Sequence, residues 1–238
     1  MLNGKNAIIT GGANGIGKQT AITFAEHGAR VAIWDLDEER GTALCNEARA
    51  QNLDIRFYKV DITDYDAVEN TFQQVVDDLG WVDILINNAG ITSDASLLKM
   101  SVEQWDKVVA VNLTGVFNCT KVAAAHMKSR SYGRIINASS VVGIYGNFGQ
   151  TNYVATKSGV IGMSKVWARE FGKYGVTVNA VAPGFIKTEM INTVPVSLIN
   201  SMIAGSAVKR LGSVEDIANA YLFLASDMAS FVTGTVLS

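Results

Sequence analysis

Short apolar runs alternate with longer amphipathic stretches along most of the chain. The apolar runs are rich in Val and Ile and almost continuous in hydrophobic character, which is typical of strands buried on both faces of a sheet. Strands are therefore predicted at 7–10, 30–34, 55–60, 84–87, 134–138, 177–181 and 231–237. Helices are predicted between them, at 17–27, 37–51, 64–79, 102–128, 151–173 and 214–226.

Strands that alternate with helices predict a parallel sheet, because each helix carries the chain back to start the next strand in the same direction. The expected fold class is α/β: a single Rossmann-type, doubly wound domain over residues 1–238, with a seven-stranded, mainly parallel sheet flanked by helices on both faces. The 238 residues, 48% of them hydrophobic, suffice for one such core. No Pro- or Ser-rich linker divides the chain.

One segment, at about 185–211, breaks the alternation. It is rich in apolar side chains, and a long insertion of this kind beside a site is typical of a lid over an apolar substrate. A helix that packs against the domain would explain the same residues, so two interpretations stay open for this segment.

The charge and the cysteine content exclude some classes of function for this protein. The formal net charge is -2, and no cluster of Lys and Arg could neutralise the phosphates of a nucleic acid. Cys45 and Cys119 lack metal-ligand spacing and lie in helical stretches, so we expect reduced thiols, no metal site and a cytoplasmic protein. The sequence shows no signal-peptide layout and no uncharged apolar run of membrane-spanning length. We therefore expect neither nucleic acid nor membrane as a partner.

Three glycines, Gly11, Gly15 and Gly17, lie in the first predicted strand-to-helix turn. Glycine permits a tight turn, lets a pyrophosphate approach the backbone, and lets the helix pack closely on the strand, while the helix start offers free N–H groups. The spacing departs from G-x-G-x-x-G because three residues separate Gly11 from Gly15. A turn that only needs positive φ is the alternative, so the glycines alone are weak support for a dinucleotide site.

Asp35 ends the second predicted strand, 18 residues after Gly17. There a carboxylate can accept hydrogen bonds from both hydroxyls of an adenosine ribose and would repel a 2′-phosphate, which favours NAD(H) over NADP(H). Asn14 supplies no cation that could pair with such a phosphate. The alternative is that Asp35 caps the helix that begins near Asp37.

Tyr153 and Lys157 are four residues apart in a predicted helix. This spacing places them on one face, where the ammonium charge would favour ionisation of the phenol and lower its pKa. For either residue alone, a boundary Tyr or a Lys that reaches solvent is the ordinary alternative. Together with the glycine turn, the pair indicates an acid/base site in a nucleotide enzyme.

Further motifs complete the pattern. They are Thr10-Gly11-x3-Gly15-x-Gly17, Asp61 after the third strand, Asn87-Asn88-Ala89-Gly90, Asn112, Ser140, Tyr153-x3-Lys157 and Pro183-Gly184. With these residues the chain resembles the short-chain dehydrogenase/reductase family over nearly its whole length. It is most similar to the 3-oxoacyl-acyl-carrier-protein reductases and the acetoacetyl-CoA reductases of that family.

The resemblance implies a bound dinucleotide and a catalytic set. The cofactor residues that it implies, together with Asp35, are Gly11, Asn14, Gly15, Ile16 and Gly17 at the pyrophosphate, Asp61, Ile62, Asn88, Ala89 and Gly90 at the adenine, and Tyr153, Lys157, Pro183, Gly184, Ile186 and Thr188 at the nicotinamide. Tyr153 would donate a proton to a substrate carbonyl as hydride arrives. Ser140 would hydrogen-bond the same oxygen, because strand alternation turns its rival Ser139 to the opposite face of the sheet. Asn112 would hold a water that links Lys157 to solvent.

We therefore expect an NAD(H)-linked reductase of 3-oxoacyl thioesters bound to acyl carrier protein or CoA. An NAD-dependent dehydrogenase of another secondary alcohol, such as a polyol, sugar or steroid, is the alternative. A noncatalytic dinucleotide-binding regulator is a third, which the intact catalytic set argues against. The family also implies a homotetramer in which the helices around 112–128 and 151–173 pack against their copies. Its members generally continue past the last strand with a short Gly-rich tail, whereas this sequence stops at Ser238, which bears on the stability of that tetramer.

Overall fold

Seven strands form one sheet in the computed structural model, which describes residues 1–187, 199 and 203–238. The order across the sheet is β3-β2-β1-β4-β5-β6-β7, and every neighbouring pair is parallel. The predicted fold class is confirmed. The strands are β1 (Asn6–Thr10), β2 (Arg30–Asp35), β3 (Ile55–Lys59), β4 (Ile84–Asn87), β5 (Gly133–Ala138), β6 (Val176–Val181) and β7 (Val236–Leu237).

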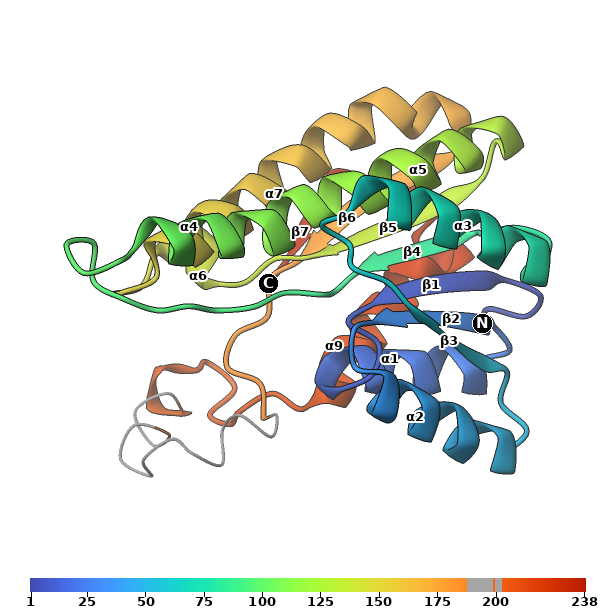
Figure 1. The fold of residues 1–238 in the computed structure, drawn as a ribbon, viewed down its shortest axis with the longest axis horizontal. Helices are drawn as coiled ribbons and strands as arrows, with labels where there is room; N and C mark the ends of the chain where they lie inside the picture. Colours follow the sequence, from blue (N-terminus) through green and yellow to red (C-terminus); the bar gives the residue numbers. More distant parts are fainter. Residues whose placement is uncertain (188–198, 200–202) are drawn as a thin grey trace.

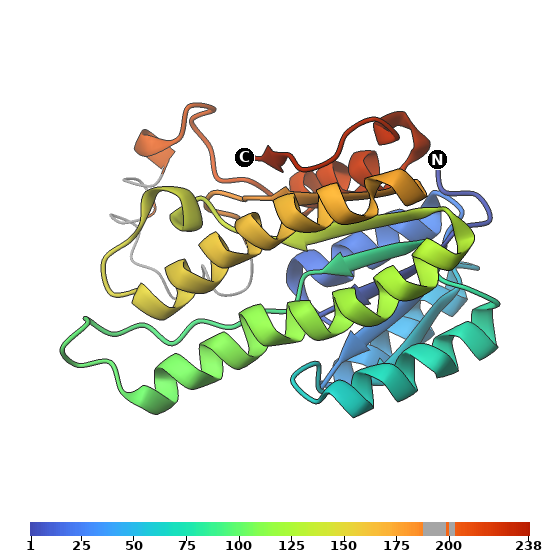
Figure 2. The ribbon, with the colours of Figure 1, turned by 90° about the horizontal axis from the view of Figure 1, so that it is seen from above.

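Helices cover both faces of the sheet (Figure 1). One face carries α1 (Gly15–Glu26), α2 (Glu38–Ala50) and α9 (Val214–Ala225). The other carries α3 (Tyr65–Leu79), α5 (Gly115–Arg130) and α7 (Thr151–Phe171), which lie side by side in Figure 2. α4 (Val102–Val109) and the π-helical turn η1 (Ala110–Thr114) run directly into α5. Shorter helical pieces are α6 (Val142–Tyr145), η2 (Gly172–Tyr174) and η4 (Asp227–Ala229).

Side-chain caps fix the start of several helices. Asp37 accepts a hydrogen bond from the N–H of Arg40 at the start of α2, and Ser101 and Ser213 form capping boxes at the starts of α4 and α9. Such caps satisfy backbone N–H groups that have no partner inside the helix. Because Asp37 is the cap of α2, the alternative interpretation of Asp35 as that cap is wrong.

The order of the strands reverses at β1: β2 and β3 follow on one side of β1, and β4 to β7 follow on the other side. Ile8 of β1 is paired with Ala32 of β2 on one side and with Leu85 of β4 on the other. The connections after β1 and β4 therefore leave in opposite directions, which opens a crevice at the carboxyl ends of these strands. A ligand site of this fold is expected in that crevice.

Two apolar clusters hold the helical layers on the sheet. Ile9 and Phe24 belong to the cluster on the α1 side, whereas Ile8 and Met127 belong to the cluster on the α5 side. All four side chains are fully buried, and each contributes about 1.5–3 kcal/mol by leaving water. Successive residues of one strand thus serve opposite layers, which explains why the strands are apolar without interruption.

The structure departs from the predicted elements in three places. The last strand was predicted over 231–237, but β7 spans only two residues, so the predicted length was wrong. Phe231 is fully exposed, and Gly234 turns the backbone with φ +74. The helix predicted over 102–128 contains the π-helical turn η1. The helix α6 was not predicted, because its four residues are too few for a periodic pattern.

The stretch Val102–Arg130 is apolar enough, over an 18-residue window, to cross a membrane by length and composition alone. Half of that window (50%) is buried inside the protein. Burial of this kind is typical of a helix that packs on a sheet.

Gly12 should tolerate no side chain. An added Cβ would lie 2.6 Å from Cβ of Ile33 and 3.0 Å from the carbonyl oxygen of Ile9, and both of these atoms are fixed in strands. We predict that Gly12→Ala lowers the free energy of unfolding by about 1–3 kcal/mol, the usual cost of overpacking. Urea denaturation measures this difference.

Gly172→Ala is the matched control for that variant. Gly172 has φ -53, and no atom of the described residues lies within 4 Å of an added Cβ. The same substitution should therefore be neutral or stabilise by up to about 1 kcal/mol. Equal losses in the two variants would contradict the packing argument.

Candidate active site

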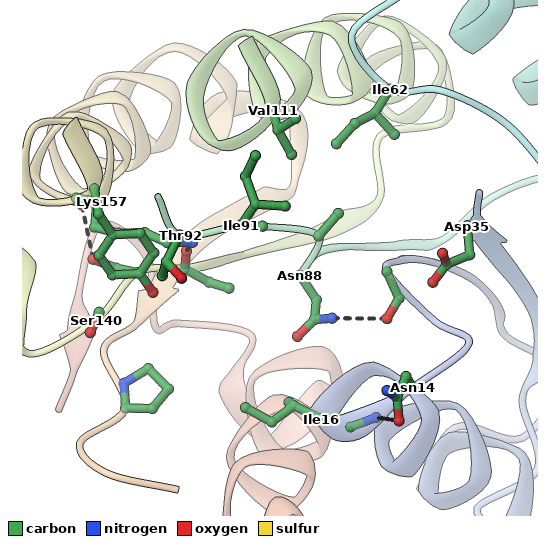
Figure 3. A pocket seen from close by; sticks show the side chains of 18 of the residues that line it. Asn14, Ile16, Asp35, Ile62, Asn88, Ile91, Thr92, Val111, Ser140 and Lys157 are labelled. Atoms are coloured by element: carbon green, nitrogen blue, oxygen red, sulfur yellow. Dashed lines mark hydrogen bonds between the residues drawn. The ribbon is translucent and has the colours of Figure 1, made fainter. Parts of the chain in front are cut away.

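A cavity of about 890 Å³ lies in the crevice at the carboxyl ends of the strands. Its size suits a small ligand or a cofactor. Figure 3 shows Asn14 and Asp35 at one end, Ser140 and Lys157 at the other, and Asn88 between them. The predicted cofactor residues that line it are Gly11, Asn14, Gly15, Ile16, Asp35, Asp61, Ile62, Asn88, Ala89, Gly90, Tyr153, Lys157, Pro183, Gly184 and Ile186.

The glycine turn forms one wall of the cavity. Gly11 and Gly15 have φ +63 and +53, a left-handed conformation that favours glycine. Gly17 is not part of the lining; an added Cβ there would overlap the carbonyl oxygen of Gly11. Gly17 therefore serves the close packing of α1 on the turn.

The start of α1 faces this wall with unpaired donors. Asn14 is the N-cap, and its side chain accepts a hydrogen bond from the N–H of Gly15 at 2.7 Å. In the part of the chain that the structure describes, the N–H groups of Ile16 and Gly17 have no hydrogen-bond acceptor. Free N–H groups and the positive end of the helix dipole form a place for phosphate groups.

Thr10 and Asn88 brace the turn against β4. The hydroxyl of Thr10 accepts hydrogen bonds from the N–H groups of Asn88 and Ala89, both at 3.0 Å. In return, the amide of Asn88 donates to the carbonyl oxygens of Thr10 and Gly11 at 3.1 and 3.2 Å. The side chain of Asn88 thus holds the cavity wall in place.

Asp35 is fixed at the end of β2 by two backbone donors. Its carboxylate accepts hydrogen bonds from the N–H of Ala13 at 3.0 Å and from the N–H of Asp37 at 3.1 Å. A carboxylate can accept about four hydrogen bonds, so two positions remain for a ligand. A half-buried negative charge therefore stands at this end of the cavity.

Two hydrogen bonds fix α7 to the end of β5 at the opposite end. Lys157 donates from Nζ to the carbonyl oxygen of Ala138 at 2.8 Å, and Ser139 donates from Oγ to the carbonyl oxygen of Lys157 at 2.9 Å. The Lys157 ammonium is buried, and burial lowers its pKa to about 8. The Ser139 hydroxyl is thus used within the fold, whereas the Ser140 hydroxyl lies beside Tyr153 and accepts a hydrogen bond from the N–H of Val142 at 3.4 Å.

Tyr153 lies one helical turn before Lys157, whose Nζ is 5.5 Å from the centre of the phenol ring. Burial is the main influence on Tyr153 and raises its pKa; a hydrogen bond with Ser140 lowers it and Asp94 raises it. The expectation of a lowered pKa was therefore wrong for the protein by itself, because burial outweighs the influence that lowers the pKa of Tyr153. Tyr153 is therefore a neutral phenol at neutral pH.

Asn112 lies fully buried in η1, close to Lys157. Its Oδ1 accepts a hydrogen bond from the N–H of Ile91 at 2.8 Å, and its Nδ2 donates to the carbonyl oxygen of Ile91 at 2.9 Å. An added Cβ on Gly90 would lie 3.3 Å from Oδ1 of Asn112 and 3.4 Å from Nζ of Lys157. The two side chains thus flank one glycine, and the water expected between Asn112 and Lys157 stays a prediction.

A second cavity of about 320 Å³ adjoins the first. Both are lined by Thr92, Ser140, Tyr153 and Gly184, so these residues stand where the cavities meet. The rest of its lining is mixed in character, with apolar Val141, Val142 and Phe185 and polar Asp94, Asn147 and Gln150.

Of the predicted lid at about 185–211, the structure describes residues 185–187, 199 and 203–211. The N–H of Lys187 donates to the carbonyl oxygen of Gly212 at 2.7 Å, and the N–H of Gly212 donates to that of Phe185 at 2.9 Å. The two ends of the segment are therefore held together. Residues 188–198 and 200–202, Thr188 among them, lie outside the described residues, so the lid and the role of Thr188 stay predictions.

Sequence reasoning missed several residues of the main cavity. Trp34 and Ile91 each adjoin a predicted residue, Asp35 and Gly90, so closeness in sequence could have found them. Tyr221 of α9 is different, since its helical pattern marks it only as a core residue. The remaining residues missed are Leu36, Val60, Thr92, Lys107, Val111, Ala138 and Ser139. Ser139 was expected on the opposite face of the sheet, and although it lines the cavity, its hydroxyl is turned to the carbonyl oxygen of Lys157.

A glycine turn before a helix start, a carboxylate at the end of β2 and a buried Tyr–Lys pair in one cavity fit a bound dinucleotide. In the residues that the structure describes, no three His, Cys, Asp or Glu side chains are grouped so as to hold a metal ion. A family model described as enoyl-(acyl carrier protein) reductase matches residues 11–238. The chain therefore belongs to the short-chain dehydrogenase/reductase family and is an oxidoreductase with a nicotinamide dinucleotide as its cofactor.

Individual relatives span nearly the whole chain. A protein of Thermotoga maritima named 3-oxoacyl-(acyl-carrier-protein) reductase FabG is 46% identical over 236 residues, which cover 99% of this chain and 96% of the relative. A protein of the same name from Staphylococcus aureus is 44% identical and covers 98% of this chain and 95% of its own length. Another from Chlamydia muridarum is 43% identical, with 100% and 96% covered.

Lys157 makes the stability of the fold depend on pH. Its pKa in the folded protein is about 8, below the value of about 10.4 for a free lysine, so the buried ammonium destabilises the fold below pH 8. This destabilisation is lost as the pH rises from about 8 to 10. We predict that the stability advantage of Lys157→Met over wild type falls by about 1–3 kcal/mol between pH 7 and pH 10, as measured by urea denaturation.

The exposed Lys165 on the same helix offers the matched control. Lys165→Met should differ from wild type by the same amount at both pH values, because solvent stabilises its ammonium in the folded and the unfolded protein. An equally flat difference for Lys157→Met would contradict the burial of a charged Lys157.

Proposed function

We propose that the protein reduces the 3-oxo group of an acyl thioester to a 3-hydroxy group, with NADH as the hydride donor. The observation that carries the proposal is the junction where Ser140 and Tyr153 line both cavities. A carbonyl at that junction would have the cofactor on one side and its acyl chain on the other. Relatives that are 46% and 44% identical and carry the name 3-oxoacyl-(acyl-carrier-protein) reductase support this substrate class.

Each residue of the junction has one task in this reaction. When bound in the main cavity, NADH would supply a hydride to the carbonyl carbon. Tyr153 gives its phenolic proton to the carbonyl oxygen, and the raised pKa of Tyr153 keeps that proton in place at neutral pH. Ser140 donates a hydrogen bond to the same oxygen while negative charge develops there. Lys157, 5.5 Å from the ring centre, then stabilises the phenolate that remains.

The second cavity suits the acyl part of such a substrate. Val141, Val142 and Phe185 offer an apolar surface beside the junction. On the polar wall, Gln150 donates a hydrogen bond to Asp94 at 2.8 Å. A volume of about 320 Å³ leaves room for a short acyl chain, and the predicted lid would add apolar surface for a longer one.

NADH is favoured over NADPH by the charge at the other end of the main cavity. Asp35 is held by Ala13 and Asp37 and still has positions for the two hydroxyls of an adenosine ribose. The 2′-phosphate of NADPH would meet this carboxylate, and Asn14 could not compensate with a positive charge. The proposal therefore departs from the thioester reductases of the family, which commonly use NADP.

We propose further that the enzyme acts in the cytoplasm as a homotetramer on substrates bound to acyl carrier protein or CoA. The free thiols Cys45 and Cys119 suit a reducing compartment. Phe117 of α5 and Val166 of α7 are 44% and 52% exposed, and these apolar side chains lie on the two helices expected to pack against their copies.

Steady-state kinetics tests the substrate class. Acetoacetyl-CoA and a 3-oxoacyl carrier protein should be reduced with a higher kcat/KM than a simple ketone, because the thioester offers binding energy remote from the reacting carbonyl. Tyr153→Phe should lower kcat on these substrates by a factor of about 10²–10⁴ and leave cofactor affinity nearly unchanged. More than a tenth of the wild-type kcat in that variant would contradict the role of Tyr153.

Two further substrates separate the competing functions. Faster turnover of a polyol or sugar than of either thioester would support a dehydrogenase of other secondary alcohols. Faster reduction of crotonyl-CoA, which carries a carbon–carbon double bond instead of a 3-oxo group, would support the activity for which the family model is named.

Cofactor choice is tested with a double variant. Asn14→Arg with Asp35→Ser should reverse the preference toward NADPH, because it removes the repelling carboxylate and supplies a charge-assisted partner for the 2′-phosphate. The kcat/KM for NADH and NADPH is measured on one ketone substrate in wild type, both single variants and the double variant. A wild-type enzyme that already prefers NADPH would refute the role given to Asp35.

A further inference from the structure

Tyr221 is a buried tyrosine without a hydrogen-bond partner in the wall of the main cavity. Its side chain is 0% exposed and lines the cavity from α9. Among the described residues, no partner reaches its hydroxyl oxygen. A buried hydroxyl that lacks a partner costs about 1–3 kcal/mol, so an apolar residue would serve the core better at this place. The proposed mechanism makes no use of this residue.

The surroundings of Tyr221 place it at the catalytic end of the cavity. It belongs to the same apolar cluster as Ala138, and Ile16 and Ile186 pack against that cluster. Ala138 is also the residue to which Lys157 is bonded. That cluster also extends to Ile33 of β2, so the position of Tyr221 follows instead from α9, which packs on β5 and β6, and from Tyr153, whose proximity raises the pKa of Tyr221.

We infer that the hydroxyl of Tyr221 binds the nicotinamide half of the bound dinucleotide and acts as a hydrogen-bond donor to it. This inference rests on the cofactor of the proposed function and is independent of the substrate. Tyr221 would touch the cofactor from the α9 side of the cavity, whereas Tyr153 and Lys157 stand on α7.

The protonation state of Tyr221 agrees with a donor role. Burial and the nearby Tyr153 both raise the pKa of Tyr221, so its phenol keeps its proton at neutral pH. A neutral phenol can donate to the carboxamide oxygen, a ribose hydroxyl or a phosphate oxygen of that half of the cofactor.

Equilibrium binding of NADH tests the contact without any turnover. Tyr221→Phe removes one oxygen atom and keeps the ring, so the Kd for NADH should rise by a factor of about 3–10, as expected for the loss of one hydrogen bond. The Kd for AMP, which fills only the adenosine end, should stay within a factor of about 2. NADH fluorescence titration gives the first value, and displacement of NADH by AMP gives the second.

Thr177→Val is the matched control. The Thr177 hydroxyl, on β6, is also buried without a partner among the described residues, but Thr177 does not line the cavity. This variant should bind NADH with wild-type affinity. Without cofactor, both variants should unfold at the same or a higher urea concentration than wild type, because each loses a hydroxyl that has no partner.

Three results would overturn the inference. An unchanged Kd for NADH in Tyr221→Phe would leave the tyrosine as a core residue only. An equal loss of NADH and AMP affinity would mean that the whole cavity has changed shape. Lower stability of the cofactor-free variant would mean that the hydroxyl bonds within the protein. If wild type binds NADPH more tightly, the same comparison is made with NADPH, so an error in the proposed cofactor choice or substrate does not affect the test.

Discussion

The attachment of α7 to the end of β5 is the constraint on which the rest of the site depends. Lys157 and Ser139 make this attachment through two hydrogen bonds that cross between helix and strand. Gly143 of α6 adds a second close contact with α7, because an added Cβ there would lie 2.9 Å from the backbone of Lys157. This close fit brings Tyr153 against Ser140 and thereby creates the point where the two cavities meet. The same attachment buries the Lys157 ammonium, which lowers the stability of the fold at neutral pH.

Much of the fold could be predicted because each strand is a short apolar run that ends where polarity returns. Six strands lie within a residue or so of their predicted limits. The seventh could not be placed, since Phe231 is apolar in sequence but fully exposed in the structure. The π-helical turn that holds Asn112 was also invisible, because one additional residue in a helical turn leaves the apolar pattern almost unchanged.

The residues of the site could be predicted wherever a motif fixes both residue type and spacing, as for Ser140, Tyr153 and Lys157. The pKa values of these side chains could not be predicted. The sequence gives no sign of how far Tyr153 is buried, so it led to the wrong direction for the pKa of Tyr153. Tyr221 was missed for a related reason: a tyrosine at a core position of α9 looks the same whether its hydroxyl is bonded or free.

Asp35 joins two properties that are usually discussed apart. The carboxylate that would select the cofactor also holds the N–H of Ala13, so it belongs to the glycine turn as much as to the ribose site. Asn14, the second residue in cofactor choice, is the N-cap of α1. A lineage that changes its cofactor would therefore weaken this turn on the way. Such a change would be tolerated mainly by variants whose stability is well above the minimum needed for folding. The evolution of cofactor preference in this fold therefore depends on the stability of the protein in which it occurs.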